Sequence, residues 1–284
     1  MTQSVDAGRR RALGIVLGSA CMLAGGLALQ AQNEPPVELR RARVQGIPTL
    51  IAHPPGTRGR RLVIWLPGFS GTKEGTETQL RALARAGFVA LSFDPYQHGE
   101  RRVESQDTLR RRVRGNIRCF FWPILARTAE EVPLMIDWAV RELGVNDRVG
   151  MGGTSMGGDI SIAAAAVDHR IRVVSAVVAT PDWMRPGSFE PPGEPDAAAR
   201  ADYDRRNPLT HLDAYRHRPY LAFQCGADDR QVPPDGAQRF VAALKPIYGP
   251  QADRLQVNLQ PGKAHGFTPE MWTWSLEWFQ KHLN

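Results

Sequence analysis

A serine placed between two glycines is the feature of the sequence that most directly indicates chemistry. Residues 153–157 read G-x-S-x-G, between an apolar run at 148–152 and an alanine-rich run at 158–167. Where a strand turns sharply into a helix, the middle residue adopts left-handed backbone geometry, and glycines beside it avoid steric collisions. We therefore predict that Ser155 presents a nucleophilic hydroxyl at the edge of a sheet, above the positive end of a helix.

A serine becomes a strong nucleophile only with a base and a carboxylate that orients the base, and later loops supply both. His265 lies in a glycine-containing loop before the last helical run, which is the expected position of the base. Asp229 follows a strand-like run and has the spacing to the preceding glycine and the following Val-Pro pair that is expected of the acid. Asp228 and Asp182 are the alternatives for the acid. The sequence thus predicts a relay of Ser155, His265 and Asp229.

The reaction of such a serine also needs two N–H donors for the negatively charged oxygen that develops on the substrate. We expect one donor to be the backbone amide of Met156 and the other to be that of Phe69, in the loop after the first central strand. Three aromatic residues are candidates for an apolar substrate pocket, with ordinary core packing as the alternative. They are Phe121, Trp122 and Trp183.

The elements that must position these residues are strands alternating with helices. An opening hairpin is expected at 40–44 and 49–53, and buried strands at 61–66, 88–93, 148–152, 173–179, 220–224 and 255–259. Helices are expected at 76–86, 118–143, 158–167, 234–244 and 271–283, with Pro123 and Pro133 breaking or kinking the second. This alternation predicts a mostly parallel sheet covered by helices on both faces.

Two segments interrupt this alternation. Residues 95–117 are charged and aperiodic, so we expect a long surface loop. Residues 186–218 contain several prolines and acidic residues with little apolar periodicity, which favours a small lid insertion over a second domain.

With these motifs in place, the chain resembles an α/β hydrolase of the dienelactone-hydrolase and prolyl-oligopeptidase-like serine esterase group. The resemblance rests on 67–74, 94–101, the 153–157 turn, the Asp229 loop and 265–267, and it covers 40–284. It implies the α/β-hydrolase fold with a small lid insertion, a small-molecule ester as substrate, and neither cofactor nor metal.

The resemblance also bears on individual residues. A dienelactone hydrolase proper uses cysteine as nucleophile, so Ser155 argues against that activity. In relatives, the stretch that contains His98 and Glu100 shapes the loop beside the active site. We predict a serine hydrolase that cleaves carboxylic esters through an acyl-enzyme. A peptidase or amidase of the prolyl-oligopeptidase type and a non-catalytic binding protein on the same scaffold are the alternatives.

Residues 1–31 have the pattern of an export signal, with arginines at 9–11 followed by an uncharged apolar run at 12–29. This pattern predicts a periplasmic or secreted protein. An uncleaved anchor, which would tether the protein to a membrane, and a lipoprotein attached through Cys21 are the alternatives.

The net charge of +7 comes from scattered arginine clusters without a nucleic-acid-binding motif, so a solvated surface is expected and nucleic acid is not an expected partner. Cys119 and Cys225 are expected to be buried free thiols, and no zinc-type spacing of ligands is present.

Overall fold

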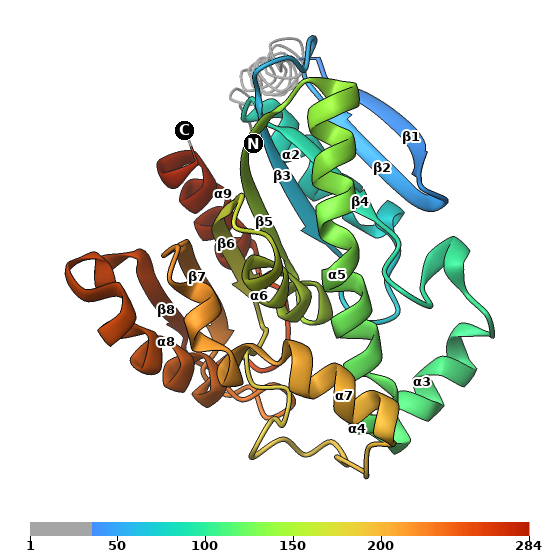
Figure 1. The fold of residues 1–284 in the computed structure, drawn as a ribbon, viewed down its shortest axis with the longest axis vertical. Helices are drawn as coiled ribbons and strands as arrows, with labels where there is room; N and C mark the ends of the chain where they lie inside the picture. The colour runs from blue at the N-terminus through green and yellow to red at the C-terminus, as the bar shows by residue number, and fades with distance from the viewer. Residues whose placement is uncertain (1–35, 284) are drawn as a thin grey trace, which may run out of the picture. The chain divides into compact units, whose positions relative to one another are not determined.

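The structure, a computed structural model, describes residues 36–283. The predicted export segment, 1–31, lies outside the described residues and stays a prediction. The described residues contain an eight-stranded sheet with the order β1-β2-β4-β3-β5-β6-β7-β8 (Figure 1). Strands β1 and β2 pair with each other and with β4 in antiparallel fashion, and every later pairing is parallel.

The strands lie where the apolar runs predict them. They are β1 Glu38–Val44, β2 Ile47–His53, β3 Arg61–Leu66, β4 Val89–Phe93, β5 Asn146–Thr154, β6 Ile171–Val177, β7 Tyr220–Gly226 and β8 Leu255–Gln260. The order of the parallel strands requires crossover connections, and the intervening helices provide them. The predicted α/β-hydrolase fold class, with its mostly parallel central sheet, is confirmed.

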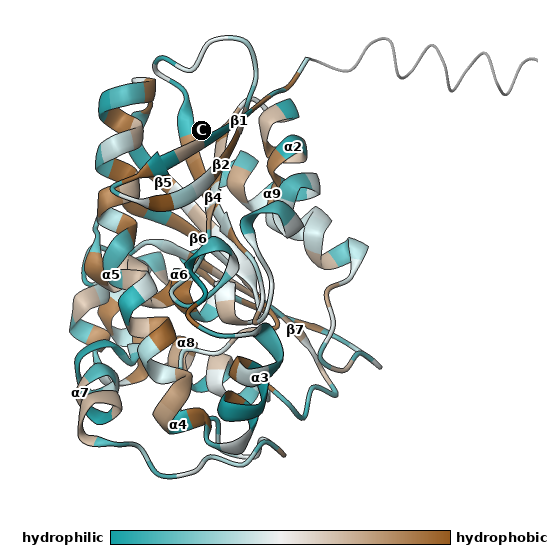
Figure 2. Ribbon diagram, turned by 90° about the vertical axis from the view of Figure 1, so that its right-hand side faces the viewer, coloured by the Kyte–Doolittle hydropathy of each residue, from teal (hydrophilic) through white to brown (hydrophobic). Residues whose placement is uncertain are grey.

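Alternate side chains of β3 face two separate cores. Leu62 and Ile64 pack into the core under α5, α6 and α8, whereas Val63 and Trp65 pack into the core under α2 and α9. Figure 2 shows the sheet edge-on between these two helical layers. The helices are α2 Glu77–Arg85, α5 Trp122–Trp138, α6 Met156–Val167, α8 Asp235–Tyr248 and α9 Pro269–His282. A strand buried on both faces needs a continuous apolar sequence, which β3 has.

The prediction of a long surface loop over 95–117 is wrong, because this segment contains helix α3, Gln106–Gly115, and the short η2, Gly99–Arg101. Leu109 and Val113 lie one helical turn apart and are 1% and 5% exposed, so they anchor α3 to the core. Ser105 caps the helix by accepting a hydrogen bond from the Thr108 amide at 3.1 Å.

The helix predicted over 118–143 is divided into α4 Ile117–Phe120, α5, and the π-helical η3 Ala139–Leu143. Pro123 lies in the first turn of α5, where a missing N–H costs nothing. Pro133 lies inside α5 without ending it. The break therefore occurs at the first proline, and the helix continues through the second.

The segment predicted as a lid, 186–218, folds into α7 Ala197–Arg206, η4 Pro208–Thr210 and η5 Leu212–Tyr215. Arg205 and Arg206 both donate to the carboxylate of Glu130 on α5, at 2.8 and 2.7 Å. This part of the segment is therefore fastened along α5, and a covering role for the segment stays a prediction.

A buried lysine joins the loops that follow β3 and β4. Lys73 is 2% exposed and begins η1 Lys73–Thr76; its Nζ lies 3.0 Å from Asp94 Oδ2, 2.7 Å from Glu100 Oε1 and 3.0 Å from Glu74 Oε1. Burial alone lowers the pKa of Lys73, but its hydrogen bonds to Glu100, Glu74 and Asp94 raise that pKa above the ordinary value. Asp94 is fully buried and also accepts hydrogen bonds from the amides of Lys73 and Glu100. The charge pair thus fixes the loop that contains Phe69.

Strand β3 and the turn into α6 approach each other so closely that glycine is required between them. A Cβ on Gly157 would lie 2.3 Å from the Leu66 carbonyl oxygen, and a Cβ on Gly153 would lie 2.6 Å from the same oxygen. Both contacts are with backbone, so a rearranged side chain could not relieve them.

We expect Gly157→Ala to lower the free energy of unfolding by about 1–3 kcal/mol or more, because the added methyl group overlaps backbone atoms. Urea denaturation measures the effect. Gly115→Ala, at the end of α3 with nothing within 4 Å of the new Cβ, is the matched control and should change stability by less than about 1 kcal/mol. Equal effects of the two substitutions would contradict the close approach.

We expect Lys73→Met to lower the free energy of unfolding by about 3–5 kcal/mol, because it leaves the Asp94 carboxylate buried without a counter-ion. The control is Arg81→Met, which removes a partly exposed pair with Glu77 and should cost less than about 1 kcal/mol. Denaturant titration of both variants at neutral pH makes the comparison. A Lys73→Met variant no less stable than Arg81→Met would show that the buried pair does not hold these loops.

Candidate active site

Ser155 occupies the turn between β5 and α6, as the sequence predicts. Its backbone has φ 52° and ψ −116°, a conformation that non-glycine residues rarely adopt. The Ser155 amide donates to the Val177 carbonyl at 2.7 Å, which fastens the turn to the neighbouring strand β6. The side-chain hydroxyl consequently lies at the carboxyl edge of the parallel strands, where the loops after the other strands converge.

The structure brings Ser155, His265 and Asp229 together in one hydrogen-bonded chain. His265 Nε2 lies 3.1 Å from Ser155 Oγ, and His265 Nδ1 lies 2.7 Å from Asp229 Oδ2. The other oxygen of Asp229 accepts hydrogen bonds from the amides of Gln231 and Val232 at 2.9 and 2.8 Å. A carboxylate held this way accepts a hydrogen bond from the protonated Nδ1, which leaves Nε2 able to accept the serine proton.

The two alternatives for the acid lie elsewhere. Asp228 is exposed. Asp182 is buried, but its carboxylate accepts from the Met184 amide at 3.0 Å and from Arg239 Nη2 at 2.7 Å. Asp229 is the carboxylate that contacts His265. Asp229 is 3% exposed, and the side chain of His265 is 20% exposed.

The two expected oxyanion donors belong to the start of α6 and to the loop after β3. Met156 is the first residue of α6, so its amide is one of those without a partner inside the helix. Phe69 lies in the loop after β3. A Cβ added to the preceding residue, Gly68, would lie 3.8 Å from the Cβ of Ser155. This arrangement places a helix N-terminus and a second loop next to the hydroxyl, and the donor roles stay predictions.

Aromatic rings support the Phe69 loop from behind. The Phe69 ring makes edge contacts with Phe121 at 5.6 Å and with the buried His98 at 5.5 Å. Burial lowers the pKa of His98, so the ring is neutral at neutral pH, and its Nδ1 lies 2.9 Å from the Tyr96 carbonyl oxygen. His98 therefore contributes packing beside the site, as the resemblance implies.

The three predicted substrate-binding aromatics are all buried. Phe121 is 4% exposed, and Trp122 and Trp183 are each 1% exposed. The Trp122 indole nitrogen donates to the Trp183 carbonyl at 2.9 Å, and its ring packs 4.3 Å from Tyr203. Trp122 thus occupies a core position, while Trp183 borders a cavity and Phe121 contacts the Phe69 loop; their part in substrate binding stays a prediction.

A second buried ion pair lies under the site and was not predicted from the sequence. Asp159, fully buried one turn after Ser155 in α6, accepts from Arg185 Nη2 at 2.6 Å and from the Thr180 amide at 2.7 Å. Burial raises the pKa of Asp159, and the adjacent Arg185 guanidinium opposes that effect. An acidic residue in an otherwise apolar helical run was the available signal, because such a side chain requires a partner.

The described residues contain no cluster of three or more potential metal ligands and no helix with the length and hydropathy needed to cross a membrane. Cys225 is a buried free thiol as predicted, and burial raises its pKa to about 12. Cys119 is also free but only partly buried.

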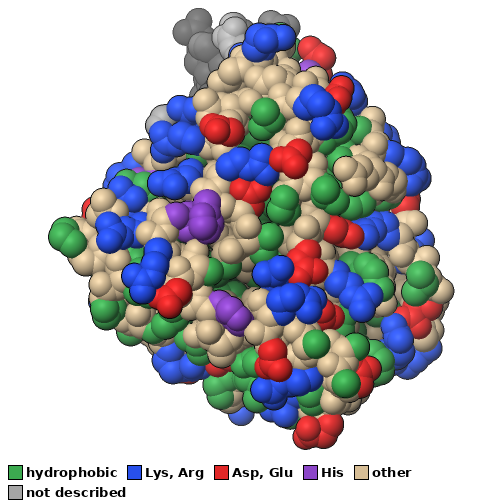
Figure 3. Space-filling model, viewed as in Figure 1, with side chains coloured by type: hydrophobic (Ala, Val, Ile, Leu, Met, Phe, Trp, Pro, Cys, Tyr) green, Lys and Arg blue, Asp and Glu red, His purple; other side chains and the backbone are tan. Residues whose placement is uncertain are grey.

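Basic and acidic side chains alternate over the face of the molecule shown in Figure 3. Many arginines of the described surface have carboxylate partners close in sequence. Examples are Arg110 with Asp107, Arg200 with Asp204, and Arg216 with Asp213. Many of the positive charges on this surface are therefore compensated locally.

Two curated relatives are similar over their full length. Esterase YjfP of Escherichia coli is 28% identical over 262 residues, which cover 87% of this chain and 100% of the relative. Putative esterase YitV of Bacillus subtilis is 26% identical over 263 residues, with 87% and 100% coverage.

Solved structures share the fold. TT1662 from Thermus thermophilus superposes with a TM-score of 0.72 at 24% identity, covering 87% of this chain and 98% of that chain. A putative dienelactone hydrolase from Klebsiella pneumoniae has a TM-score of 0.64 at 18% identity, with 87% and 100% coverage. The acylaminoacyl peptidase of Pyrococcus horikoshii has a TM-score of 0.63 at 15% identity, and this chain covers only 43% of it.

The family model described as the prolyl oligopeptidase family matches residues 127–284, more than half of the chain. The matched region contains Ser155, Asp229 and His265. Together with the sheet order and the turn at Ser155, this match shows that the chain belongs to the prolyl oligopeptidase family and is a serine hydrolase with the α/β-hydrolase fold.

Proposed function

We propose that this protein hydrolyses carboxylic esters through an acyl-enzyme formed on Ser155. The observation that carries the proposal is the continuous relay from Ser155 Oγ to His265 Nε2 at 3.1 Å and from His265 Nδ1 to Asp229 at 2.7 Å. Both distances fall within the range for hydrogen bonds between a nucleophile, its base and the group that orients the base.

In the first half of the reaction, the Ser155 hydroxyl gives its proton to His265 Nε2 while Oγ bonds to the ester carbonyl carbon. The carbonyl oxygen becomes negatively charged and accepts hydrogen bonds from the amides of Met156 and Phe69. The carbon–oxygen bond to the alcohol then breaks, and the alcohol leaves with the proton from His265.

In the second half, a water molecule gives a proton to His265 and attacks the acyl carbon. The bond to Ser155 Oγ breaks, and the serine recovers its proton from His265 as the carboxylic acid leaves. Asp229 stays ionised throughout. It fixes the orientation of the imidazole and stabilises the positive charge that His265 carries in both halves.

Preference for esters over amides is supported by the names and full-length coverage of the curated relatives, one an esterase and the other a putative esterase. Amide cleavage is the second candidate, because the family includes oligopeptidases and the fold is shared with an acylaminoacyl peptidase. Parallel assays with 4-nitrophenyl acetate or butyrate and aminoacyl 4-nitroanilides separate the two candidates: faster turnover of the anilides would replace the ester proposal with the amide one.

Ser155→Ala removes the nucleophile, so we expect kcat for 4-nitrophenyl butyrate to fall at least about 1,000-fold. Release of 4-nitrophenolate measures turnover, and the far-ultraviolet circular dichroism spectrum checks that the variant is folded. Near-wild-type turnover in the folded variant would exclude Ser155 as the nucleophile.

Asp229→Asn should lower kcat by about 10,000-fold, because an amide at this position favours the wrong tautomer of His265. Asp228→Asn is a matched control at the adjacent, exposed position and should leave kcat within about twofold. Steady-state kinetics on the two variants test the assignment of the acid. The assignment would be reversed if Asp228→Asn caused the larger loss.

A further inference from the structure

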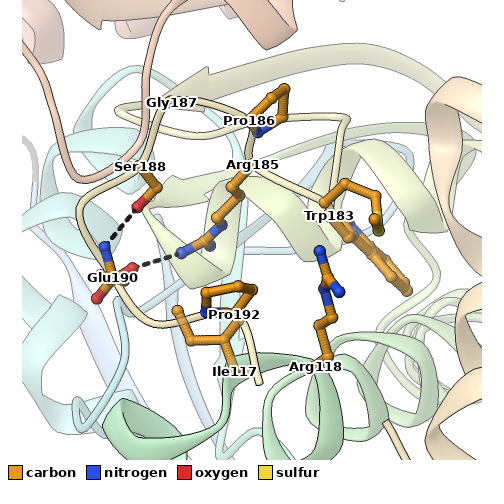
Figure 4. A pocket seen from close by; sticks show the side chains of 10 residues that line it. Ile117, Arg118, Trp183, Arg185, Pro186, Gly187, Ser188, Glu190 and Pro192 are labelled. Carbon is orange, nitrogen blue, oxygen red and sulfur yellow. Dashed lines mark hydrogen bonds and ion pairs between the residues drawn. The ribbon is translucent and has the colours of Figure 1, made fainter. Parts of the chain in front are cut away.

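A pocket of about 180 Å³ lies between α4 and the loop that follows β6 (Figure 4). Its walls are largely apolar, and Arg118, Arg185 and Glu190 are the charged residues among them. Its apolar wall includes Ile117, Trp183 and Pro192. A pocket of this composition fits an apolar chain that ends in a polar or charged group.

The loop that forms this pocket also contacts the elements that carry the relay. Arg185 pairs with Asp159, which lies one turn after Ser155 in α6. Ser188 Oγ donates to the carbonyl of Gln231 at 2.8 Å, in the loop that carries Asp229. These contacts connect the loop that lines the pocket to the two elements that carry Ser155 and Asp229.

The Phe69 side of the site borders the same loop. The Arg185 guanidinium lies 4.9 Å from the centre of the Phe121 ring, and Phe121 in turn makes an edge contact with Phe69 at 5.6 Å. Arg185, which lines the pocket, is thus connected through Phe121 to the loop that carries Phe69.

Two of the three charged side chains in the pocket have partners within the protein. Arg185 is 8% exposed and pairs with Asp159 at 2.6 Å and with Glu190 at 3.2 Å. Glu190 also accepts a hydrogen bond from Gln231 Nε2 at 3.1 Å. Arg185 is shared between two carboxylates and therefore has no spare positive charge for a ligand, which leaves Arg118 as the cation of the pocket that could bind an anion.

Arg118 is different. Its Nε is buried without a hydrogen-bond partner in the described part of the chain. Its Nη1 lies 3.9 Å from a carboxylate oxygen of Glu194, whose side chain is 92% exposed, so that interaction is long and screened by water. The backbone of Arg118 is fixed by a 3.0 Å hydrogen bond from its amide to the Pro192 carbonyl. A weakly paired guanidinium at the wall of an apolar pocket is suited to a planar anion such as a carboxylate.

We propose that Arg118 is a specificity-determining residue and that this pocket binds a carboxylate carried by the ester substrate. The preferred substrates are then half-esters of dicarboxylic acids, or esters whose alcohol carries a carboxylate. This inference rests on the proposed function, because it names the class of ester that the Ser155 site hydrolyses.

The test compares anionic esters with their own neutral methyl esters. Mono-4-nitrophenyl adipate is paired with methyl 4-nitrophenyl adipate, which places the carboxylate on the acid side. 4-Acetoxybenzoate is paired with methyl 4-acetoxybenzoate, which places it on the alcohol side. For the wild-type protein, kcat/KM should favour the anionic member of one pair, and that pair identifies the side of the ester that occupies the pocket.

Arg118→Gln should reduce the anionic-to-neutral ratio of kcat/KM about 10- to 100-fold, the range for a hydrogen bond to a charged group, and leave the neutral methyl ester within about twofold. Arg114→Gln, which removes an exposed arginine of α3, is the matched control for overall charge and should leave the ratio unchanged. A wild-type ratio below one in both pairs, or equal ratios in wild type and Arg118→Gln, would overturn the proposal. Turnover of the methyl esters in the same assays would still support ester hydrolysis, so the two proposals can fail separately.

If the wild-type protein cleaves none of these esters, that result counts against the proposed function. A binding measurement then tests the carboxylate site separately. Monomethyl adipate, or 4-acetoxybenzoate for the alcohol side, is titrated calorimetrically into Ser155→Ala and into the Ser155→Ala, Arg118→Gln double variant. The dissociation constant should rise about 10- to 100-fold in the double variant. Equal affinity in the two variants, or no binding by either, would reject the carboxylate site.

Discussion

The close approach of α6 to the end of β3 is the constraint on which the active site depends. The helix begins directly after Ser155, and only glycine fits where Gly157 faces the Leu66 carbonyl oxygen. Because of this approach, the serine hydroxyl and the first amides of α6 lie next to the loop that carries Phe69. The positive φ of Ser155 costs roughly 1–3 kcal/mol, and the surrounding backbone contacts maintain it.

Two buried ion pairs hold the loops around that turn. Lys73 and Asp94 fix the loop behind Phe69, and Arg185 and Asp159 fix the loop beside α6. Buried ion pairs often add little net stability, because desolvation of the two charges offsets their attraction. We infer that their main effect here is positional: each connects a loop near the relay to the scaffold, and breaking either would leave an uncompensated buried charge.

The parts of the fold that local sequence patterns determine could be predicted. The continuous apolar run of β3 indicated a strand buried on both faces, and the glycines around Ser155 indicated the sharp turn. Helix α3 was missed because its many arginines obscured two core residues one turn apart. The ion pairs could not be predicted, because their partners lie 21 and 26 residues apart and only the folded chain brings them together. The sequence also did not distinguish core from pocket at Trp122, which the structure buries.

Covalent trapping tests most directly whether Ser155 is the nucleophile that His265 activates. A fluorophosphonate that reacts with activated serines would be incubated with the protein, which is then digested with trypsin. Tandem mass spectrometry of the peptide 149–170 can distinguish Ser155 from Ser161, which lies in the same peptide. We expect one adduct, on Ser155, that is lost in His265→Ala. An adduct on another residue, or undiminished labelling without the imidazole, would contradict this expectation.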